Sequence, residues 1–192
     1  FDLASDLTEN HGYSPQEIEF TFESDKPDDL HILQTRDQEL HISQESMVFL
    51  QSPDQMTLLG RGIGIGGGAM NGLAAFDEKD IEELRSINNG AHIILIRPDT
   101  VPDDIGMIFA CDGLLTARGG ATSHAAVTAV KLGKTCVVNC SKMMVNELQK
   151  SCNLDGHVLK TGDPISIDGT LGNIYLGHYP LEMASRDEGY YY

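Results

Sequence analysis

His124 stands in a segment whose other residues could bind an anion. The stretch RGGATSHAAVTAVKLGK, residues 118–134, places this histidine after two glycines and two hydroxyl residues and before an apolar run. Thr122 or Ser123 would serve as a helix N-cap, and Gly133 would end the helix. The spacing therefore predicts a helix that has His124 in its first turn.

The start of such a helix attracts phosphate. Its first backbone N–H groups have no partner inside the helix, and the helix dipole adds about half a positive charge. Gly119 and Gly120 would allow further backbone amides to approach the ligand. The guanidinium of Arg118 and the hydroxyls of Thr122 and Ser123 would bind the remaining oxygens. We therefore expect these five residues to stabilise a phosphoryl group.

The chemistry expected of His124 is nucleophilic. A neutral imidazole, with an unperturbed pKa of about 6.5, is available as a nucleophile at pH 7. Ser123 beside His124 could also suggest a hydrolase, but neighbours at a helix start seldom face each other, and the chain has no GxSxG turn. We predict that His124 itself carries the phosphoryl group. The other histidines lie in expected strands or loops without partners at ligand spacing: His11, His31, His41, His92, His157 and His178.

Two glycine motifs do not fit the nucleotide-binding fingerprints. In a dinucleotide fingerprint the glycines open a helix, whereas the run at 60–68 is followed by AMNGLAAF, and the next helix is expected only from Asp77. The GKT at 133–135 lacks the glycine that a P-loop needs five residues earlier, where Thr128 stands. The alternation of glycine with apolar residues instead predicts bent strands or close backbone approach.

The charge of the chain limits the class of partner. A formal net charge of −16 over 192 residues argues against binding to nucleic acid or to an anionic membrane surface. The segment between Asp112 and Glu147 nevertheless contains no acid and holds four cations: Arg118, Lys131, Lys134 and Lys142. This distribution indicates either a place that tolerates an anion or a buried core that excludes acids together with water.

Cysteine usage and hydropathy indicate the compartment. The four cysteines form no CxxC pair, so a zinc site is disfavoured and buried reduced thiols are expected. No apolar run approaches the roughly 20 residues of a membrane span, and the first residues carry acids where a signal peptide carries bases. We therefore expect a cytoplasmic protein without a membrane partner; the sequence does not decide whether it forms a homo-oligomer.

The expected elements fall into two parts. Alternation from Ile18 to Phe22 and in LHILQTR predicts a β-hairpin within residues 1–36, and residues 37–59 are expected to be a linker with one short element. A helix is expected from Asp77 to Gly90. Strands at 92–97, 113–117 and 135–139, with helices at 101–111 and from His124, form a β-α-β-α-β series that predicts a parallel sheet. A compact β-rich part follows.

The segment LLTARGGATSHAAVTAVKLGKTCVVNC resembles the phosphohistidine, or swivelling, domain of the pyruvate phosphate dikinase and phosphoenolpyruvate synthase family, which also includes the sugar-transport enzyme I. GHVLKTGDPISIDGTLGNIYLG is similar to the dikinase branch, and SPQEIEFTF and LHILQTR are similar to the last strands of its ATP-grasp domain. The resemblance covers residues 11 to 36 and about 61 to 181. It implies an α/β chain: a three-layer β/β/α swivelling phosphohistidine domain, preceded by a β-hairpin remnant of an ATP-grasp domain.

The resemblance also implies roles for particular residues. His124 would be the phosphorylated histidine, and Thr122 matches a position used for regulatory phosphorylation in plant dikinases. Glu19 would lie near the Mg²⁺ that accompanies ATP, Gln34 beside it, and Arg36 on the nucleotide phosphates. In the family the domain rotates between an ATP site and a distant pyruvate site.

The chain departs from the family pattern in three ways. The family has HAAVVAR where this chain has HAAVTAVK, so Val130 with Lys131 beside it replaces an arginine. The segment between the QTR strand and the glycine run is shorter than in dikinases. Most of the ATP-grasp domain and the pyruvate-binding barrel are missing from these 192 residues, so we do not expect the chain alone to complete a turnover.

The sequence thus predicts a phosphocarrier in which His124 takes a phosphoryl group from ATP and passes it to pyruvate, forming phosphoenolpyruvate. The alternatives are a phosphoenolpyruvate synthase, a related phosphotransferase with another acceptor, and a non-catalytic interaction domain of the same fold. The domain boundaries that we predict are 1–40 for the last ATP-grasp strands, 41–60 for a linker, 61–181 for the swivelling domain and 182–192 for a tail.

Overall fold

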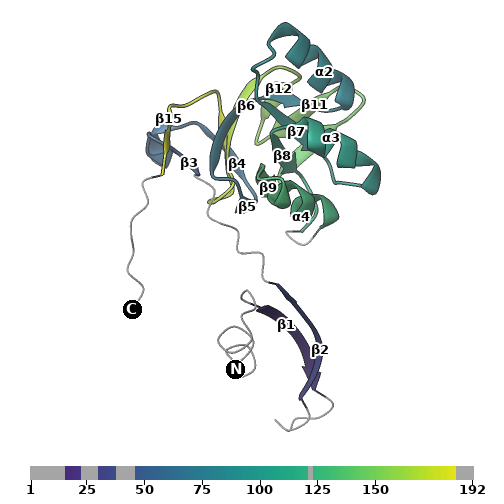
Figure 1. The fold of residues 1–192 in the computed structure, drawn as a ribbon. Coiled ribbons are helices and arrows are strands. Elements are labelled where there is room, and N and C mark those ends of the chain that lie inside the picture. Colours follow the sequence, from purple (N-terminus) through teal and green to yellow (C-terminus); the bar gives the residue numbers. More distant parts are fainter. Residues whose placement is uncertain (1–15, 23–29, 38–45, 121–122, 185–192) are drawn as a thin grey trace. The chain divides into compact units, whose positions relative to one another are not determined.

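A computed structural model of the chain describes residues 16–22, 30–37, 46–120 and 123–184 (Figure 1). The side chains of residues 16–20, 22, 34–37, 124 and 125 are outside the described part. The chain divides into two compact units, Phe1–Ser43 and Gln44–Tyr192. Each unit is therefore described by itself.

The first unit contains an antiparallel hairpin. Strands β1 (Gln16–Phe22) and β2 (Leu30–Asp37) pair with Ile18 opposite Thr35, and the register shifts between Glu19 and Phe20. The predicted hairpin is confirmed, because the alternating apolar residues of both segments lie in these strands.

The second unit is built on one eight-stranded sheet of order β4-β14-β13-β6-β7-β8-β9-β5. Four neighbouring strands, β6 to β9, run parallel, and the remaining pairings are antiparallel. Helices connect the parallel strands: α2 (Glu78–Ile87), α3 (Ile105–Ala110) after the 3-10 turn η3 (Pro102–Asp104), and α4 (His124–Lys131). The strands are β4 (Leu58–Arg61), β5 (Ile63–Gly66), β6 (Ala69–Ala75), β7 (Ile93–Arg97), β8 (Gly113–Thr116), β9 (Thr135–Val138), β13 (Pro164–Asp168) and β14 (Asn173–Leu176).

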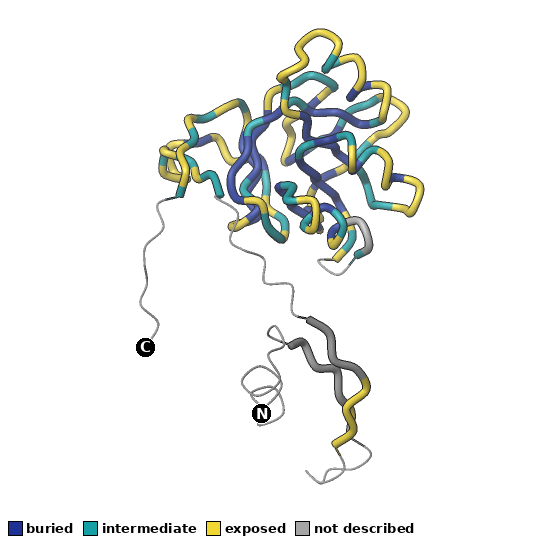
Figure 2. The backbone as a smooth tube through the Cα atoms, in the orientation of Figure 1, coloured by how far each residue is buried: buried dark blue, intermediate teal, exposed yellow. Residues whose placement is uncertain are grey.

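A second sheet completes a three-layer arrangement. It consists of β10 (Met143–Asn146), β11 (Ser151–Leu154) and β12 (His157–Lys160). Along β7, Ile94 and Ile96 pack in a core shared with this small sheet, whereas Ile93 and Leu95 pack in a core shared with the helices. Successive residues of a strand point to opposite faces, so β7 is buried on both sides. Figure 2 shows the central strands of the unit in the colour of buried residues. The predicted β/β/α architecture is confirmed.

The segment expected to be a linker contains elements of the second unit. Strand β3 (Met47–Phe49) pairs with β15 (Leu181–Met183), the 3-10 turn η2 (Pro53–Gln55) follows it, and β4 joins the main sheet. Three-residue strands give no periodicity in the sequence, and the partner of β3 lies about 130 residues later in the chain. The assignment of these segments to domains of a longer protein stays a prediction.

Helix α2 is shorter than the sequence suggested. It begins after the predicted N-cap Asp77, whose side chain accepts a hydrogen bond from the backbone of Asp80, but it ends at Ile87, and Asn88 is the C-cap. Ile81 is buried, whereas Ile87 is 83% exposed. The apolar spacing therefore predicted the helix correctly, but the helix ends before the predicted Gly90.

The glycine run brings the edge of the main sheet against the β13–β14 turn. The backbone N–H of Gly66 donates to the carbonyl of Gly169 at 3.0 Å, and the N–H of Gly169 donates to the carbonyl of Gly68 at 2.7 Å. A Cβ placed on Gly169 would lie 1.9 Å from the carbonyl oxygen of Gly66, so no side chain fits there. This is the close backbone approach that the sequence predicted.

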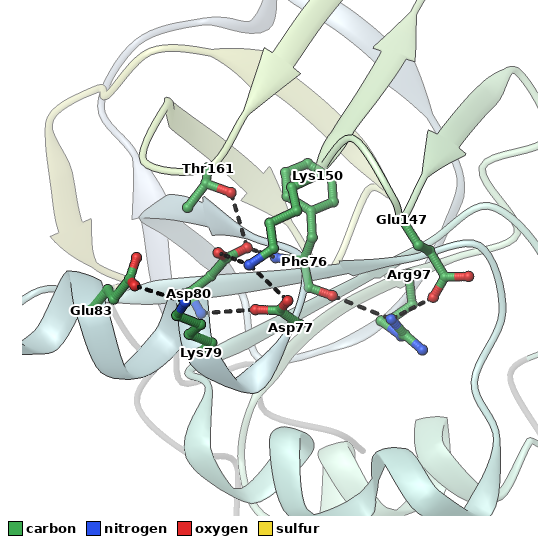
Figure 3. A network of polar contacts seen from close by, with 9 residues as sticks. All are labelled: Phe76, Asp77, Lys79, Asp80, Glu83, Arg97, Glu147, Lys150 and Thr161. Carbon is green, nitrogen blue, oxygen red and sulfur yellow. Dashed lines mark hydrogen bonds and ion pairs between the residues drawn. The ribbon is translucent and has the colours of Figure 1, made fainter.

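A buried carboxylate joins the three layers (Figure 3). Asp80, whose side chain is 3% exposed, accepts hydrogen bonds from the backbone N–H of Phe76 at 2.9 Å, from the Thr161 hydroxyl at 2.9 Å and from Lys150 Nζ at 2.8 Å. Asp77 also pairs with Lys150, at 2.7 Å, and these two carboxylates raise the pKa of Lys150. The network fixes the start of α2 to the turn before β11, through Lys150, and to the turn after β12, through Thr161.

We expect Asp80→Ala to lower the free energy of unfolding by about 2–4 kcal/mol, because three donors lose their acceptor inside the protein. Urea unfolding followed by circular dichroism measures the loss. Glu83→Ala is the matched control on the same helix: its exposed pair with Lys79, at 3.8 Å, should contribute less than about 0.5 kcal/mol. Equal effects of the two substitutions would contradict this account of the network.

All four cysteines are reduced and buried, as predicted. Burial raises the pKa of Cys111 to about 11 and the pKa values of Cys136 and Cys152 to about 12, and it also raises the pKa of Cys140. Because the thiolate is the reactive form, these thiols should be inert at neutral pH. No helix in the described ranges is long and apolar enough to cross a membrane.

A disulfide-exchange reagent tests this burial. At pH 8 the native chain should not react during the time in which free cysteine reacts completely, since the raised pKa values leave few thiolates and the core excludes the reagent. Four thiols should react after unfolding in guanidinium chloride. Rapid reaction of any thiol in the native chain would show that the core is open there.

Candidate functional site

The predicted site lies where α4 begins, at one edge of the parallel strands (Figure 1). Strand β8 ends at Thr116, the connection runs to residue 123, and α4 starts at His124. The carboxyl ends of parallel strands meet at one edge of a sheet, and this edge is the usual place for a ligand in α/β proteins. The prediction that His124 lies in the first turn of a helix is confirmed for its backbone.

Ser123 is the N-cap of α4. Its backbone is extended, and its hydroxyl accepts a hydrogen bond from the N–H of Ala126 at 3.3 Å. Its carbonyl accepts a bond from the N–H of Val127, and its own N–H donates to the carbonyl of Gly120, both at 3.0 Å. Of the two N-caps that the sequence allowed, Ser123 holds the position, and Thr122 lies outside the described residues.

The loop before α4 is shaped by the neighbouring connection. The backbone N–H groups of Ala117 and Arg118 donate to the carbonyls of Arg97 and Pro98, at 3.1 and 2.9 Å. Gly119 has a φ of +97°, and a Cβ on it would lie 3.2 Å from Asp99 Oδ1. Both the backbone angle and this contact favour glycine at position 119.

Arg118 and Gly120 are exposed at this edge of the sheet. Thr116, which is buried, donates its hydroxyl to the carbonyl of Arg118 at 2.6 Å and so holds the backbone of that residue. Within the described part of the chain, the guanidinium of Arg118 forms no ion pair within 4.0 Å. No carboxylate among the described residues therefore pairs with its charge.

The acid-free segment does not form one basic site in space. Lys134 Nζ donates to the carbonyls of Phe109 and Cys111, so it caps the end of α3, at the opposite edge of the sheet from His124. Lys131 is the last residue of α4. Asp99, which comes from outside the acid-free segment, lies beside Gly119. Folding thus separates cations that are close in sequence and brings an acid to the loop.

Two residues at this edge were missed in the sequence: Arg97, the last residue of β7, and Asp99, in the connection that follows it. The side chain of Arg97, 15% exposed, pairs with Asp104 at 3.1 Å and with Glu147 at 2.6 Å, which fixes the end of β7 (Figure 3 shows the Glu147 contact). Asp99 follows two residues later. Adjacent parallel strands end at the same edge of a sheet, so the connections that follow β7 and β8 must lie side by side. This rule could have placed Arg97 and Asp99 near the loop before α4.

The residues expected to face a nucleotide lie in the hairpin of the first unit. Glu19 is in β1, Gln34 and Arg36 are in β2, and Glu19 is directly opposite Gln34 in the register. Their side chains and that of His124 lie outside the described part. The roles of these residues therefore stay predictions.

Val130, at the position where the resemblance implies an arginine, lies against β5. A Cβ on Gly66 would be 3.7 Å from Val130 Cγ2, so the valine side chain packs over the glycine backbone. At this position the helix contributes packing rather than charge.

Comparison with known proteins agrees with the resemblance read from the sequence. Residues 90–172 match the family model described as "PEP-utilising enzyme, mobile domain". The chain is 35% identical over 210 residues to pyruvate, phosphate dikinase of Rickettsia felis, covering 94% of this chain and 23% of that protein. It is 43% identical over 114 residues to pyruvate, phosphate dikinase 2 of Zea mays, covering 59% of this chain and 13% of that protein.

A solved structure, the NMR solution structure of Enzyme I (nEIt), is 26% identical to this chain with a TM-score of 0.32, covering 44% of this chain and 30% of that one. The chain spans about a quarter or less of the length of the curated relatives that it matches. The family model and the dikinase relatives confirm the resemblance to the mobile domain of PEP-utilising enzymes.

The N-cap of α4 can be tested by two substitutions. Ser123→Ala should lower the free energy of unfolding by about 1 kcal/mol, because the N–H of Ala126 loses its acceptor. Ser123→Asp should keep the stability of the parent chain, since aspartate is an equally good N-cap and its charge favours the helix start. Denaturant unfolding measures both, and equal stability of all three chains would show that Ser123 does not cap α4.

Proposed function

We propose, on the premise that residues 90–172 form the mobile domain of a PEP-utilising enzyme, that this chain is the phosphocarrier of a pyruvate phosphate dikinase-like phosphotransferase. The observation that carries the proposal is the position of His124. It is the first residue of α4, directly after the N-cap, at the edge where parallel strands end. A histidine there can attack phosphorus, and the oxygens of the transferred phosphoryl group would then lie at the N-terminus of the helix, which is the positive end of its dipole.

In the first step an imidazole nitrogen of His124 would attack the β-phosphorus of ATP, so that a P–N bond forms, the P–O bond to AMP breaks and the histidine carries a pyrophosphoryl group. Transfer of the terminal γ-phosphoryl group to phosphate or to water would then leave a single phosphoryl group on the imidazole. In the second step the enolate oxygen of pyruvate attacks the same phosphorus and the P–N bond breaks, which regenerates the imidazole. The helix dipole, the amides around Gly119 and Gly120 and the guanidinium of Arg118 would stabilise the phosphoryl oxygens in both steps. Catalysis by this unit is therefore mainly positioning and charge stabilisation.

ATP and pyruvate would bind to neighbouring domains, between which the unit would rotate. Within residues 16–22, 30–37, 46–120 and 123–184, no three His, Cys, Asp or Glu side chains gather as a metal site. The resemblance implies that Mg²⁺ is held with ATP, where Glu19, Gln34 and Arg36 are the residues that we expect to contribute. Thr122 is the residue that we expect to be modified if the protein is regulated as plant dikinases are. The cytoplasmic location stays a prediction.

Another acceptor in place of pyruvate, or a synthase that uses no phosphate, would employ the same carrier chemistry. A non-catalytic interaction domain is the candidate from another class. It is favoured by one observation, the packing of Val130 where the family has an arginine. These alternatives differ in whether His124 is phosphorylated and in which compound receives the phosphoryl group.

Incubation of the full-length protein with Mg²⁺ and β-labelled ATP tests the proposal. We expect label that is stable to alkali and labile to acid, because phosphohistidine has these properties. Label from γ-labelled ATP should not remain on the protein once the γ-phosphoryl group has passed to phosphate or to water. His124→Ala should abolish labelling. If the full-length protein is folded but takes up no label, the proposal is wrong and the non-catalytic interaction domain is favoured. Adding pyruvate or other acceptors, with and without phosphate, then identifies the acceptor.

Ser123→Asp separates binding of the phosphoryl group from folding. It should retain stability but slow the labelling of His124 by about tenfold or more, since a carboxylate at the helix start repels the phosphoryl oxygens and each 1.4 kcal/mol is about a factor of ten. The initial rate of labelling measures this effect, with Ser123→Ala as the control that adds no charge. Equal rates for the two variants would argue against phosphoryl binding at the start of α4.

A further inference from the structure

The edge of the main sheet that is formed by β4 holds a pocket that the proposed reaction does not use. The pocket has a volume of about 520 Å³, and its lining residues come from the 3-10 turn η2 and from strands β4 and β14, with the residues next to them. None of these residues belongs to the connection 117–124 that forms the predicted phosphoryl site. A volume of this size is typical of sites for small organic ligands.

Two buried polar side chains of β14 line this pocket. Asn173 Nδ2 donates a hydrogen bond to the Tyr175 hydroxyl at 2.8 Å, and both residues are buried. Within the described part of the chain, Asn173 Oδ1 accepts no hydrogen bond and the Tyr175 hydroxyl donates none. Burial raises the pKa of Tyr175, so the phenol keeps its proton at neutral pH. One acceptor and one donor are thus left unused beside the pocket, and a ligand that paired with them would remove an unfavourable desolvation.

Two charged side chains of opposite sign also line the pocket. Arg61 is the last residue of β4 and Asp54 lies in η2, and both residues are exposed. Neither of them forms an ion pair within 4.0 Å with another described residue. The charge of Arg61 lowers the pKa of Tyr175, although burial raises it more, so the guanidinium lies near the phenol. The pocket therefore offers one cation and one anion to a ligand.

The remaining lining residues are apolar: Pro53, Met56 and Leu58. Met56 is buried, whereas Leu58 is 41% exposed. A ligand with an apolar part that covered Leu58 would remove this surface from water, which is favourable.

We propose that this pocket binds a free α-amino acid that has an apolar side chain. The α-carboxylate would bind the guanidinium of Arg61, the α-ammonium would bind Asp54 and Asn173 Oδ1, and the side chain would pack on Leu58. A phosphate ester is disfavoured, because Asp54 lines the same pocket and the whole chain has a net charge of −16. This inference does not rest on the proposed function, because the binding requires no phosphoryl transfer.

Titration of the full-length protein with amino acids tests the proposal. Saturation-transfer NMR is recorded with leucine, isoleucine, valine, methionine and phenylalanine, each up to about 10 mM, in the absence of ATP. At least one of them should bind saturably with a Kd of about 1 mM or tighter, which corresponds to about −4 kcal/mol. If none of the five binds, the proposal is wrong.

Ligand analogues test whether both charges are recognised. The N-acetyl derivative of the bound amino acid lacks the ammonium, and its methyl ester lacks the carboxylate. Each analogue should bind at least about tenfold more weakly, because it loses one charge-assisted hydrogen bond. An analogue that binds as tightly as the amino acid itself would overturn recognition of a zwitterion.

Protein variants locate the binding in this pocket. Arg61→Gln and Asp54→Asn change exposed residues, and each should weaken binding by about tenfold or more, with an unchanged circular dichroism spectrum. The matched controls Lys142→Gln and Glu83→Gln remove charges of the same signs from exposed positions outside the pocket and should leave the affinity unchanged. If Arg61→Gln binds as tightly as Lys142→Gln, the amino acid binds elsewhere and the assignment of this pocket is wrong.

Discussion

Burial of the parallel strands on both faces is the constraint on which the rest of the structure depends. Residues 93–96 alternate between the two cores, so β7 cannot move without disturbing both the helices and the small sheet. Strand β8 pairs with β7 in register, and the loop to α4 continues that pairing through Ala117 and Arg118. The position of His124 therefore follows from the packing of β7 and β8, whose buried residues take no part in the proposed reaction.

Three charged groups in this protein differ in how they are paired. Asp80 and Arg97 are largely buried and have several polar partners, so they hold α2, the end of β7 and the turns of the small sheet in fixed relation. Arg118 is exposed and has no carboxylate partner within the described ranges. In a chain of net charge −16 this difference distinguishes a structural cation from one that can bind an anion.

The second unit fits the demands of the phosphocarrier that we propose. A phosphoryl group must reach two sites without being lost to water, so the atoms that hold it should keep their geometry while the unit moves. The cap of α4, the Gly119 loop and the sheet supply that geometry.

The sequence by itself determined the hairpin, the parallel β-α-β-α-β series, the helix that begins at His124 and the burial of the cysteines. These features depend on signals within a few residues, such as the cap at Ser123, the alternation in β1 and the apolar run of β7. Only the tertiary structure decided the pairing of β3 with β15, the approach of Asp99 to Gly119 and the separation of Lys134 from Arg118. Each of these results from contacts between residues far apart in the chain or on opposite edges of the sheet, and no local pattern of residue types encodes which distant segments meet.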